Sequence, residues 1–227
     1  MIGVFDSGVG GLNSFSELRR YLPLADIVYL ADRQNAPYGT KTEDELIRLV
    51  KKDIQRLRSF GADKILIACC TASTVFPYLD ANERDGVMPI ITPTAHAAAV
   101  LSEKIAVIAT EHTTASGAFG NEIRAISKNA TVTEISAQEL VSLVESGERD
   151  DRLTERGERY LDTLSETIKA SGADSLIYGC THFSHIQREL SKRLPKVKSL
   201  LPSKIGAHSF LALCSDEHGS GRSIYTE

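Results

Sequence analysis

The chain has 227 residues, of which 42% are apolar, and a formal net charge of −4. A chain of this length can form one large domain or two domains of about 100 residues each. Its Lys and Arg residues form no basic block, which excludes nucleic acid as the main partner, because phosphate binding requires clustered cations. The apolar stretches are shorter than the roughly 20 residues of a membrane span, so we expect no membrane segment.

Short strand-like runs alternate along the chain with longer segments of helical periodicity. In residues 43–59, for example, apolar residues recur at spacings of three and four, which is typical of an amphipathic helix. Strand and helix in this rhythm predict an α/β fold of mostly parallel sheets flanked by helices. The expected strands are Ile2–Asp6, Ile27–Ala31, Lys64–Ala68, Met88–Ile91, Lys104–Ala109, Thr131–Ile135, Ser175–Gly179 and Val197–Leu200.

A short motif that ends in a cysteine occurs in each half of the chain. Gly61-Ala62-Asp63 leads through an apolar run to Cys69, and Gly172-Ala173-Asp174 leads through another to Cys180, 111 residues after the first cysteine. Repeats at this distance indicate two like domains, because solenoid repeats recur at roughly 20–50 residues. Ligands of parallel α/β sheets bind beyond the carboxyl ends of the strands, where both cysteines lie. We therefore expect two pseudo-symmetric domains with the active site in the interdomain cleft and one thiol on each side.

Pro93 and Pro202 are the predicted crossing points between the two domains. The resulting first domain is discontinuous and comprises residues 1–92 plus 202–227, and the second comprises residues 93–201. The final stretch from about Ser215 is rich in Gly, Ser and charged residues, so we expect a frayed tail. The four cysteines, two of them adjacent, suit free thiols in a reducing cytoplasm better than a disulfide framework.

Four segments of the sequence resemble glutamate racemases, within the aspartate/glutamate racemase family. They lie in the family's order and spacing over about residues 1–215, and they are Asp6-Ser7-Gly8-Val9-Gly10-Gly11-Leu12, Pro37-Tyr38-Gly39 after Asp32, Ala68-Cys69-Cys70-Thr71-Ala72-Ser73 and Gly179-Cys180-Thr181-His182. The resemblance implies an enzyme that converts L-glutamate to D-glutamate for peptidoglycan synthesis without pyridoxal phosphate. It also implies two pseudo-symmetric α/β domains and, in many relatives, a homodimer.

The resemblance assigns the acid and the base of the reaction to Cys69 and Cys180. It places Asp6 beside the first cysteine and His182 beside the second as groups that tune or relay protons, and Glu145 matches a further carboxylate on the Cys180 side. The residues that it assigns to substrate binding are Ser7, Pro37, Tyr38, Gly39, Cys70, Thr71 and Thr181. Cysteine suits acid and base work because its ordinary pKa of about 8.5 lies near neutrality and falls beside cations or helix N-termini.

The first cysteine of the pair has an alternative. Alignment of the two halves on Gly-Ala-Asp pairs Cys69 with Cys180, whereas alignment on Cys-Thr pairs Cys70 with Cys180. We favour Cys69 because the family motif and the Gly-Ala-Asp spacing agree on it. Adjacent thiols can also oxidise, so their position predicts a redox-sensitive activity.

The same motifs also have purely structural interpretations. A lone cysteine is more often part of a core than of a catalytic site, and Asp6-Ser7-Gly8 can form a cap and turn ahead of the helix expected near Gly11. Asp32 with Pro37-Tyr38-Gly39 can be a tight turn. The glycines lack the third position of the dinucleotide motif G-x-G-x-x-G, and the cysteines and histidines lack the usual zinc-binding spacings. We therefore expect neither a cofactor nor a metal.

Three segments depart from the family pattern. Cys70 stands where the family usually has Asn, and the segments Phe183-Ser184-His185-Ile186 and Pro202-Ser203-Lys204 differ from their family counterparts. A thiol is a poor hydrogen-bond donor and cannot replace both functions of an amide. Three alternatives therefore stay open: an aspartate racemase, a weakly active or inactive relative that binds an acidic ligand or a protein partner, and another cysteine-based isomerase or decarboxylase of small dicarboxylates.

Overall fold

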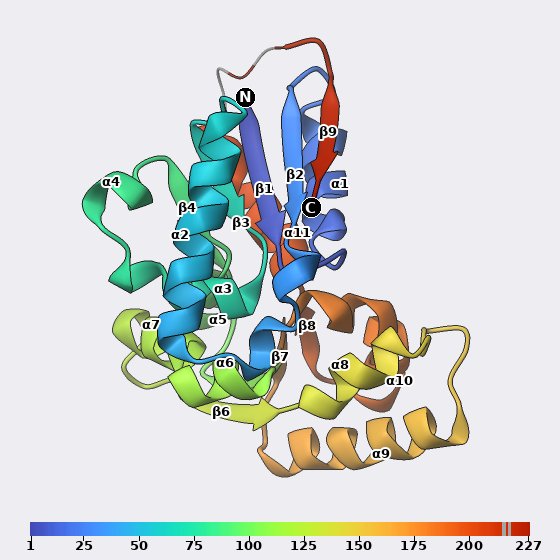
Figure 1. Ribbon diagram of the computed structural model, residues 1–227. Coiled ribbons are helices and arrows are strands. Elements are labelled where there is room, and N and C mark those ends of the chain that lie inside the picture. Colours follow the sequence, from blue (N-terminus) through green and yellow to red (C-terminus); the bar gives the residue numbers. More distant parts are fainter. Residues whose placement is uncertain (215–216, 218) are drawn as a thin grey trace. The chain divides into compact units, whose positions relative to one another are not determined.

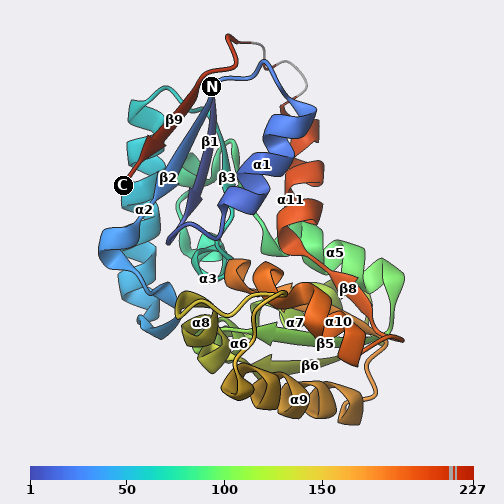
Figure 2. The ribbon, with the colours of Figure 1, turned by 90° about the vertical axis from the view of Figure 1, so that its right-hand side faces the viewer.

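The computed structural model describes residues 1–214, 217 and 219–227 (Figure 1). The described chain divides into two compact units, Met1–Pro93 with Pro202–Glu227, and Thr94–Leu201. Each unit contains a sheet whose strands pair in parallel and whose faces are flanked by helices (Figure 2). The predicted α/β fold class is therefore confirmed.

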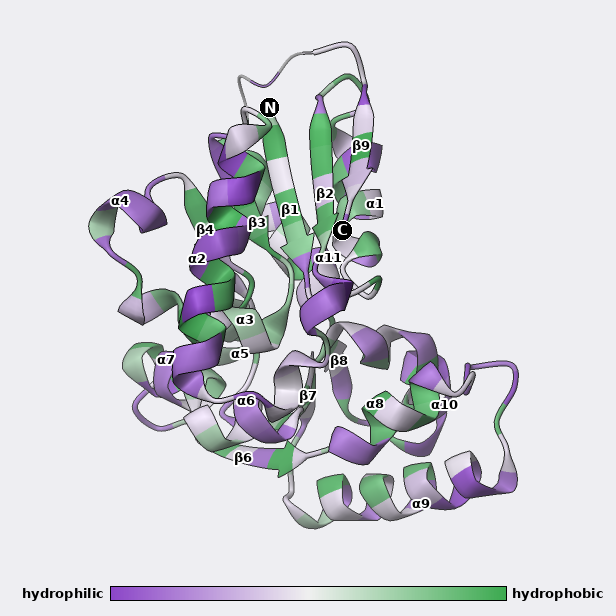
Figure 3. Ribbon diagram, in the orientation of Figure 1, coloured by the Kyte–Doolittle hydropathy of each residue, from purple (hydrophilic) through white to green (hydrophobic). Residues whose placement is uncertain are grey.

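The sheet of the first unit has the strand order β4-β3-β1-β2-β9. Its strands are β1 (Ile2–Asp6), β2 (Ile27–Ala31), β3 (Lys64–Ile67), β4 (Val87–Pro89) and β9 (Ser223–Thr226). The central strands β1 and β2 are buried along their whole length, and their mainly hydrophobic character is visible in Figure 3. Parallel strands covered on both faces have nearly continuous apolar sequences, which is why these strands could be predicted from the sequence.

Along the chain, the helices of the first unit lie between its strands. They are α1 (Leu12–Tyr21), α2 (Glu43–Ser59), α3 (Cys70–Ser73), α4 (Ala81–Arg84) and α11 (Pro202–Phe210), with the short 3-10 turns η1 (Arg33–Asn35), η2 (Tyr38–Thr40), η3 (Phe76–Tyr78) and η5 (Leu211–Leu213). The boundary between the two units falls within α5 (Ile91–Leu101).

The sheet of the second unit has the strand order β6-β5-β7-β8. Its strands are β5 (Lys104–Ala109), β6 (Thr131–Ser136), β7 (Ser175–Gly179) and β8 (Lys198–Leu200). The helical segments are α6 (Glu111–Ser116), α7 (Ala118–Ile126), α8 (Gln138–Glu145), α9 (Glu155–Ala170), η4 (Thr181–Ile186) and α10 (Gln187–Arg193).

The two sheets share one pattern of strand positions. β3 lies between β4 and β1, and β7 lies between β8 and β5, so β3 and β7 occupy corresponding places. A glycine in the left-handed region follows the helix before each of these strands, Gly61 with φ of 88° after α2 and Gly172 with φ of 68° after α9. Glycine is favoured there because a side chain would be strained at positive φ. The repeated Gly-Ala-Asp motif thus makes the same helix-to-strand turn twice.

The helix predicted for residues 43–59 is present with those bounds as α2. Its start is fixed by a capping box, in which Thr42 Oγ1 accepts the backbone N–H of Glu45 at 3.3 Å and Glu45 Oε2 accepts the backbone N–H of Thr42 at 2.9 Å. Its apolar residues lie in the core of the first unit, and bands of hydrophobic and hydrophilic residues alternate along it in Figure 3. The buried side chains of α2 are Leu46, Val50, Asp53, Ile54 and Leu57.

The expectation of a frayed tail is wrong for the end of the chain, where residues 223–226 form β9. This strand pairs in parallel with β2, with Ile27 opposite Ser223. The Asp26 carboxylate accepts the backbone N–H of Arg222 at 2.9 Å and so fixes the approach to the strand. The Ser-Ile-Tyr-Thr sequence contains β-branched and aromatic residues that favour strands, and β2 supplies the partner. Ser215, Asp216 and His218, where the expected fraying begins, lie outside the described residues.

Candidate functional site

The first group of predicted site residues lies where β1 ends. Asp6 is fully buried, and its Oδ2 atom accepts hydrogen bonds from the backbone amides of Gly8 at 3.2 Å and Gly11 at 3.1 Å. Gly11 has no room for a side chain, because a Cβ atom there would lie 2.6 Å from the Cβ atom of Asp6. The turn between β1 and α1 therefore folds around the Asp6 carboxylate, so this residue has a structural role whatever else it does.

Cys69 lies just after β3 and caps the short helix α3. Its Sγ atom accepts the backbone N–H of Ala72 at 3.5 Å and lies 3.6 Å from Ser7 Oγ. Burial of the thiol, followed by the negative charge of Asp6, raises the pKa of Cys69 to about 12. A helix N-terminus can lower the pKa of a cysteine, but burial and the Asp6 charge outweigh that effect for Cys69. The sulfur of Cys69 is therefore a neutral thiol at neutral pH.

The Pro37-Tyr38-Gly39 segment leads into the 3-10 turn η2. Pro37 is exposed, whereas Tyr38 and Gly39 are buried. This turn packs against α3, and Tyr38 belongs to the same core cluster as Cys69. The structure thus brings the segment to the helix that carries Cys70 and Thr71, both of which are buried.

The second group of predicted site residues follows β7 in the other unit. Cys180 is partly exposed, and its Sγ atom lies 3.6 Å from Nδ1 of His182. Nε2 of the same imidazole lies 3.5 Å from Oε1 of Glu145, the last residue of α8. With the ring hydrogen on Nε2, directed at Glu145, Nδ1 can accept the thiol proton of Cys180. The three side chains form a line along which a proton can move, and the buried Thr181 lies between the cysteine and the histidine in sequence.

The two thiols follow corresponding strands but have different surroundings. Cys69 is buried beside a carboxylate, which disfavours a second negative charge, so it retains its proton. Cys180 is partly exposed beside an imidazole, which can receive its proton and return it. The two thiols therefore differ in how readily they lose a proton.

Sequence reasoning missed the buried carboxyl group of Asp53 on α2. Its Oδ2 atom lies 2.9 Å from the hydroxyl oxygen of Tyr38, and the same hydroxyl lies 2.6 Å from Oδ2 of Asp32. The signal was available, because Asp53 occupies the apolar stripe of the helix between Val50 and Leu57. A charged residue at such a position needs a polar partner inside the core.

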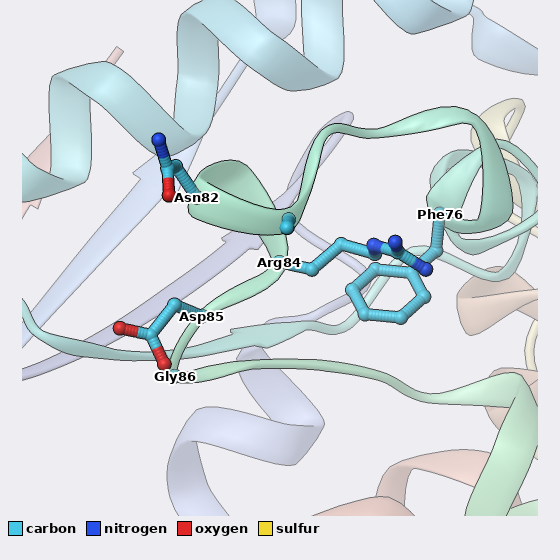
Figure 4. Close-up of a pocket in the computed structure, with 6 residues that line it drawn as sticks. Phe76, Asn82, Arg84, Asp85 and Gly86 are labelled. Carbon is cyan, nitrogen blue, oxygen red and sulfur yellow. The ribbon is translucent and has the colours of Figure 1, made fainter.

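The described residues contain no group of three or more His, Cys, Asp or Glu side chains that could bind a metal ion. Within the same residues, none of the helices has the length and apolar character that a membrane crossing requires. A pocket of about 550 Å³ in the first unit is lined by Phe76, Ala81, Asn82, Arg84, Asp85 and Gly86 (Figure 4). None of the predicted site residues lines this pocket, so it is separate from both groups described above.

Comparisons with known proteins agree on one group of relatives. A family model described as Asp/Glu/Hydantoin racemase matches residues 18–209. The glutamate racemase of Desulforudis audaxviator is 37% identical over 206 residues, which are 89% of this chain and 74% of that protein. The glutamate racemase of Persephonella marina is 36% identical over 224 residues, 97% of this chain and 85% of that protein. The structure of Francisella tularensis glutamate racemase in complex with D-glutamate superimposes with a TM-score of 0.89 at 28% identity, over 99% of this chain and 85% of that chain.

Proposed function

The chain belongs to the Asp/Glu/Hydantoin racemase family, and from this premise we propose that it racemises glutamate with Cys69 and Cys180 acting on opposite faces of the α-carbon. Curated relatives that match most of the chain are glutamate racemases, which supports glutamate rather than aspartate as the substrate. The activity is an amino-acid isomerisation, in which one α-proton is removed and another is added from the opposite side.

The proton and electron balance of this reaction needs only the two sulfurs. A thiolate removes the α-proton, and the electron pair of the broken C–H bond stays on the α-carbon. The opposite thiol then gives its proton to that carbon and becomes the new thiolate. The product is the inverted amino acid, and the protein is left with its proton on the other cysteine. The reverse reaction uses the same pair in exchanged roles.

The observation that carries the proposal is the matched placement of the two thiols. Cys69 follows β3 and Cys180 follows the corresponding strand β7. Each has a side chain beside it that can accept a proton, the Asp6 carboxylate or the His182 imidazole. Cysteines that serve only to fill a core need no such neighbours.

The two proton acceptors have different work in this scheme. Cys69 becomes a base only after its thiol proton moves away. We assign the acceptor role to the carboxylate of Asp6, whose negative charge acts on this thiol. On the other side, His182 takes and returns the proton of Cys180, and Glu145 orients the imidazole and stabilises its charged form. Asp6 and His182 thus set which thiol is ready as a base for each enantiomer.

The substrate's carboxylates need hydrogen-bond donors near the sulfurs. Turns that follow strands provide such donors, because backbone amides and hydroxyls point out of the sheet edge there. We assign this role to Ser7, Tyr38, Gly39, Cys70, Thr71 and Thr181, whereas Pro37, which has no N–H, would line the site and shape the turn. Ser7 contacts the Cys69 sulfur directly at 3.6 Å, which supports its place next to the reacting carbon. Cys70 gives the weakest donor of the set.

The cellular role, assembly and compartment that we propose are those expected for the same family. D-Glutamate made by this chain would supply peptidoglycan synthesis. The two units correspond in this proposal to the two racemase domains, and a homodimer is the assembly that we expect. None of the four cysteines, all of which lie within the described residues, forms a disulfide, and we expect a reducing compartment such as the cytoplasm.

The test is incubation of the purified protein with L-glutamate, and separately with L-aspartate, in deuterated buffer without pyridoxal phosphate. Chirality and α-deuterium are followed together. We expect glutamate to be inverted with uptake of one deuterium per turnover and aspartate to react far more slowly. Faster inversion of aspartate would identify aspartate as the substrate. Binding of glutamate without any exchange would identify the chain as a ligand-binding protein and not a catalyst.

A further inference from the structure

The hydroxyl group of Tyr38 lies between two buried carboxyl groups inside the first unit. Its oxygen is 2.6 Å from Oδ2 of Asp32 and 2.9 Å from Oδ2 of Asp53. All three side chains are almost inaccessible to water. We call this arrangement the Asp32–Tyr38–Asp53 clamp.

The number of protons in the clamp follows from its geometry. A phenol has a single hydrogen to donate, so it can satisfy only one of two carboxylates. The second contact requires a carboxylic acid that donates to the phenol oxygen. Asp32 also accepts hydrogen bonds from Nδ2 of Asn35 at 2.9 and 3.0 Å, so both of its oxygens already act as acceptors. Asp53 therefore keeps the extra proton and donates it to Tyr38, and Tyr38 donates to Asp32.

The clamp joins three elements at the edge of the proposed site. Asp32 follows β2, Asp53 lies on α2, and Tyr38 begins the turn η2. That turn packs against α3, which Cys69 caps. The position of the turn, and with it the backbone of Gly39, therefore depends on the hydrogen bonds that hold the Tyr38 side chain.

We propose that Asp53 is a positioning residue for the racemase reaction: its neutral form holds the Tyr38–Thr40 turn in place for substrate binding, and its ionised form releases that turn. The inference rests on the proposed function, because the turn matters to the reaction only if Tyr38 and Gly39 contact the substrate. Asp53 itself touches neither the substrate nor the cysteines in this scheme, and it acts through Tyr38.

The charges around Asp53 place its ionisation near neutral pH. Burial, followed by the negative charge of Asp32, raises the pKa of Asp53 to about 7. The opposing effects are a hydrogen bond that Tyr38 can donate to the ionised carboxylate and the charges of Lys52 and Arg56 on the same helix. Below that pH the extra proton is present and both contacts of the phenol are satisfied. Above it two carboxylates compete for one hydrogen and repel each other, which weakens the clamp.

Three variants isolate this effect. Asp53→Asn keeps a neutral group that can donate to the Tyr38 oxygen at every pH, whereas Asp53→Leu keeps the branching of the side chain, at a larger volume, but removes the hydrogen bond. Asp44→Asn is the matched control, because Asp44 lies on the same helix and is exposed. The measurements are KM and kcat for L-glutamate between about pH 6 and about pH 8.5, on either side of the Asp53 ionisation.

We expect the KM of the wild-type protein and of Asp44→Asn to rise by about tenfold over this range, the equivalent of one lost hydrogen bond. The KM of Asp53→Asn should stay nearly constant and that of Asp53→Leu should be high throughout. The same rise of KM in Asp53→Asn as in the wild type would overturn the proposal. The test depends on the Asn variant, so it stands even where the Leu variant does not fold.

Hydrogen exchange gives a readout that does not require racemisation. The Lys41 amide donates to the Tyr38 carbonyl at 3.1 Å, so its exchange reports on the closure of the turn. At about pH 8.5, where Asp53 is ionised in the wild type, the peptide that contains residues 38–41 should exchange faster in the wild type than in Asp53→Asn, and equally fast in both at about pH 6. Equal exchange at both pH values contradicts the clamp. If the exchange difference is seen but the protein does not invert glutamate, the clamp is supported and the proposed function is refuted.

Discussion

Nδ1 of His182 lies 3.6 Å from the sulfur of Cys180, while the other nitrogen of the ring lies 3.5 Å from Glu145. General acid and base groups contribute about 10²–10⁴-fold to such reactions, so His182→Asn should lower kcat by that order. Glu145→Gln should cost much less, since the Glu145 side chain is 57% exposed and its charge is screened by water. The exposed His208 provides the control variant His208→Asn, and a wild-type kcat in His182→Asn would exclude the relay.

Replacement of either of the two cysteines that we propose as acid and base should stop racemisation but leave proton exchange on one face of the α-carbon. In Cys69→Ala and in Cys180→Ala one proton donor is missing, so inversion cannot be completed. The remaining thiol can still remove and return a proton on its own face, so deuterium exchange should persist for one enantiomer in each variant, and for opposite enantiomers in the two. Nuclear magnetic resonance of the α-hydrogen, with L- and D-glutamate supplied separately, measures this. Full turnover in either variant would disprove the two-base scheme.

The raised pKa of Cys69 predicts that this thiol reacts slowly with alkylating agents at neutral pH. The folded-state pKa is about 12, so its thiolate is rare at pH 7 and its rate of modification should increase with pH across the neutral range. Asp6→Asn removes a negative charge that raises this pKa and should therefore accelerate the reaction. Labelling with iodoacetamide in a Cys70→Ala background, followed by mass spectrometry of the Cys69 peptide, gives the rate. A faster reaction in the wild type than in Asp6→Asn would contradict this account.

Cys70 is the position at which a single substitution should improve the enzyme. An amide in its place offers a donor and an acceptor to the substrate, where a thiol offers a weak donor. Cys70→Asn should lower the KM for glutamate by up to about tenfold, the effect of one good hydrogen bond of about 1.4 kcal/mol. Cys70→Ser, which is smaller and has one hydroxyl, serves as the comparison. An unchanged KM in the Asn variant would remove Cys70 from the substrate contacts.

The free energy of unfolding should depend on pH through Asp53. The pKa of this carboxyl group is raised from 3.8 to about 7 in the folded protein, so the folded state binds its proton more tightly than the unfolded state. Its contribution is complete below about pH 4 and is lost as the pH rises to about 7, with a loss on the order of 4 kcal/mol. Asp53→Asn should therefore be more stable than the wild type at about pH 8, by up to this amount. Urea unfolding of the variant and the wild type at about pH 4 and about pH 8 measures this difference in the free energy of unfolding. If Asp53→Asn gained less over the wild type at pH 8 than at pH 4, the pH dependence would have the opposite sign.

Much of the fold could be predicted because its central strands are buried on both faces. β1, β2, β5 and β7 occur at the predicted residues, and so does α2, whose apolar stripe and Thr42 cap are both local signals. β9 could not be predicted in this way, since a short edge strand after a Gly- and Ser-rich segment depends on a partner that is distant in sequence. The residues of the candidate site, apart from Glu145, belong to the four motifs of the sequence.

The electrostatics of the site could not be read from the sequence. The pKa of Cys69 depends on how deeply the thiol is buried and how near the Asp6 charge lies, and neither is a property of the motif. Asp53 gave a visible signal as a charged residue in an apolar stripe, but its meaning depends on Asp32 and Tyr38, which reach it from other elements. Long-range pairing of this kind appears only once the chain is folded.

β9 has a consequence for how the chain behaves when it is shortened. It supplies hydrogen bonds to one side of β2, and the Ile27 amide also donates to the carbonyl of Arg222 at 2.9 Å. A chain cut before Ser223 would leave those amides and carbonyls of β2 open at the sheet margin. Unpaired margins of this kind recruit strands from neighbouring molecules, so the last few residues protect the protein from aggregation.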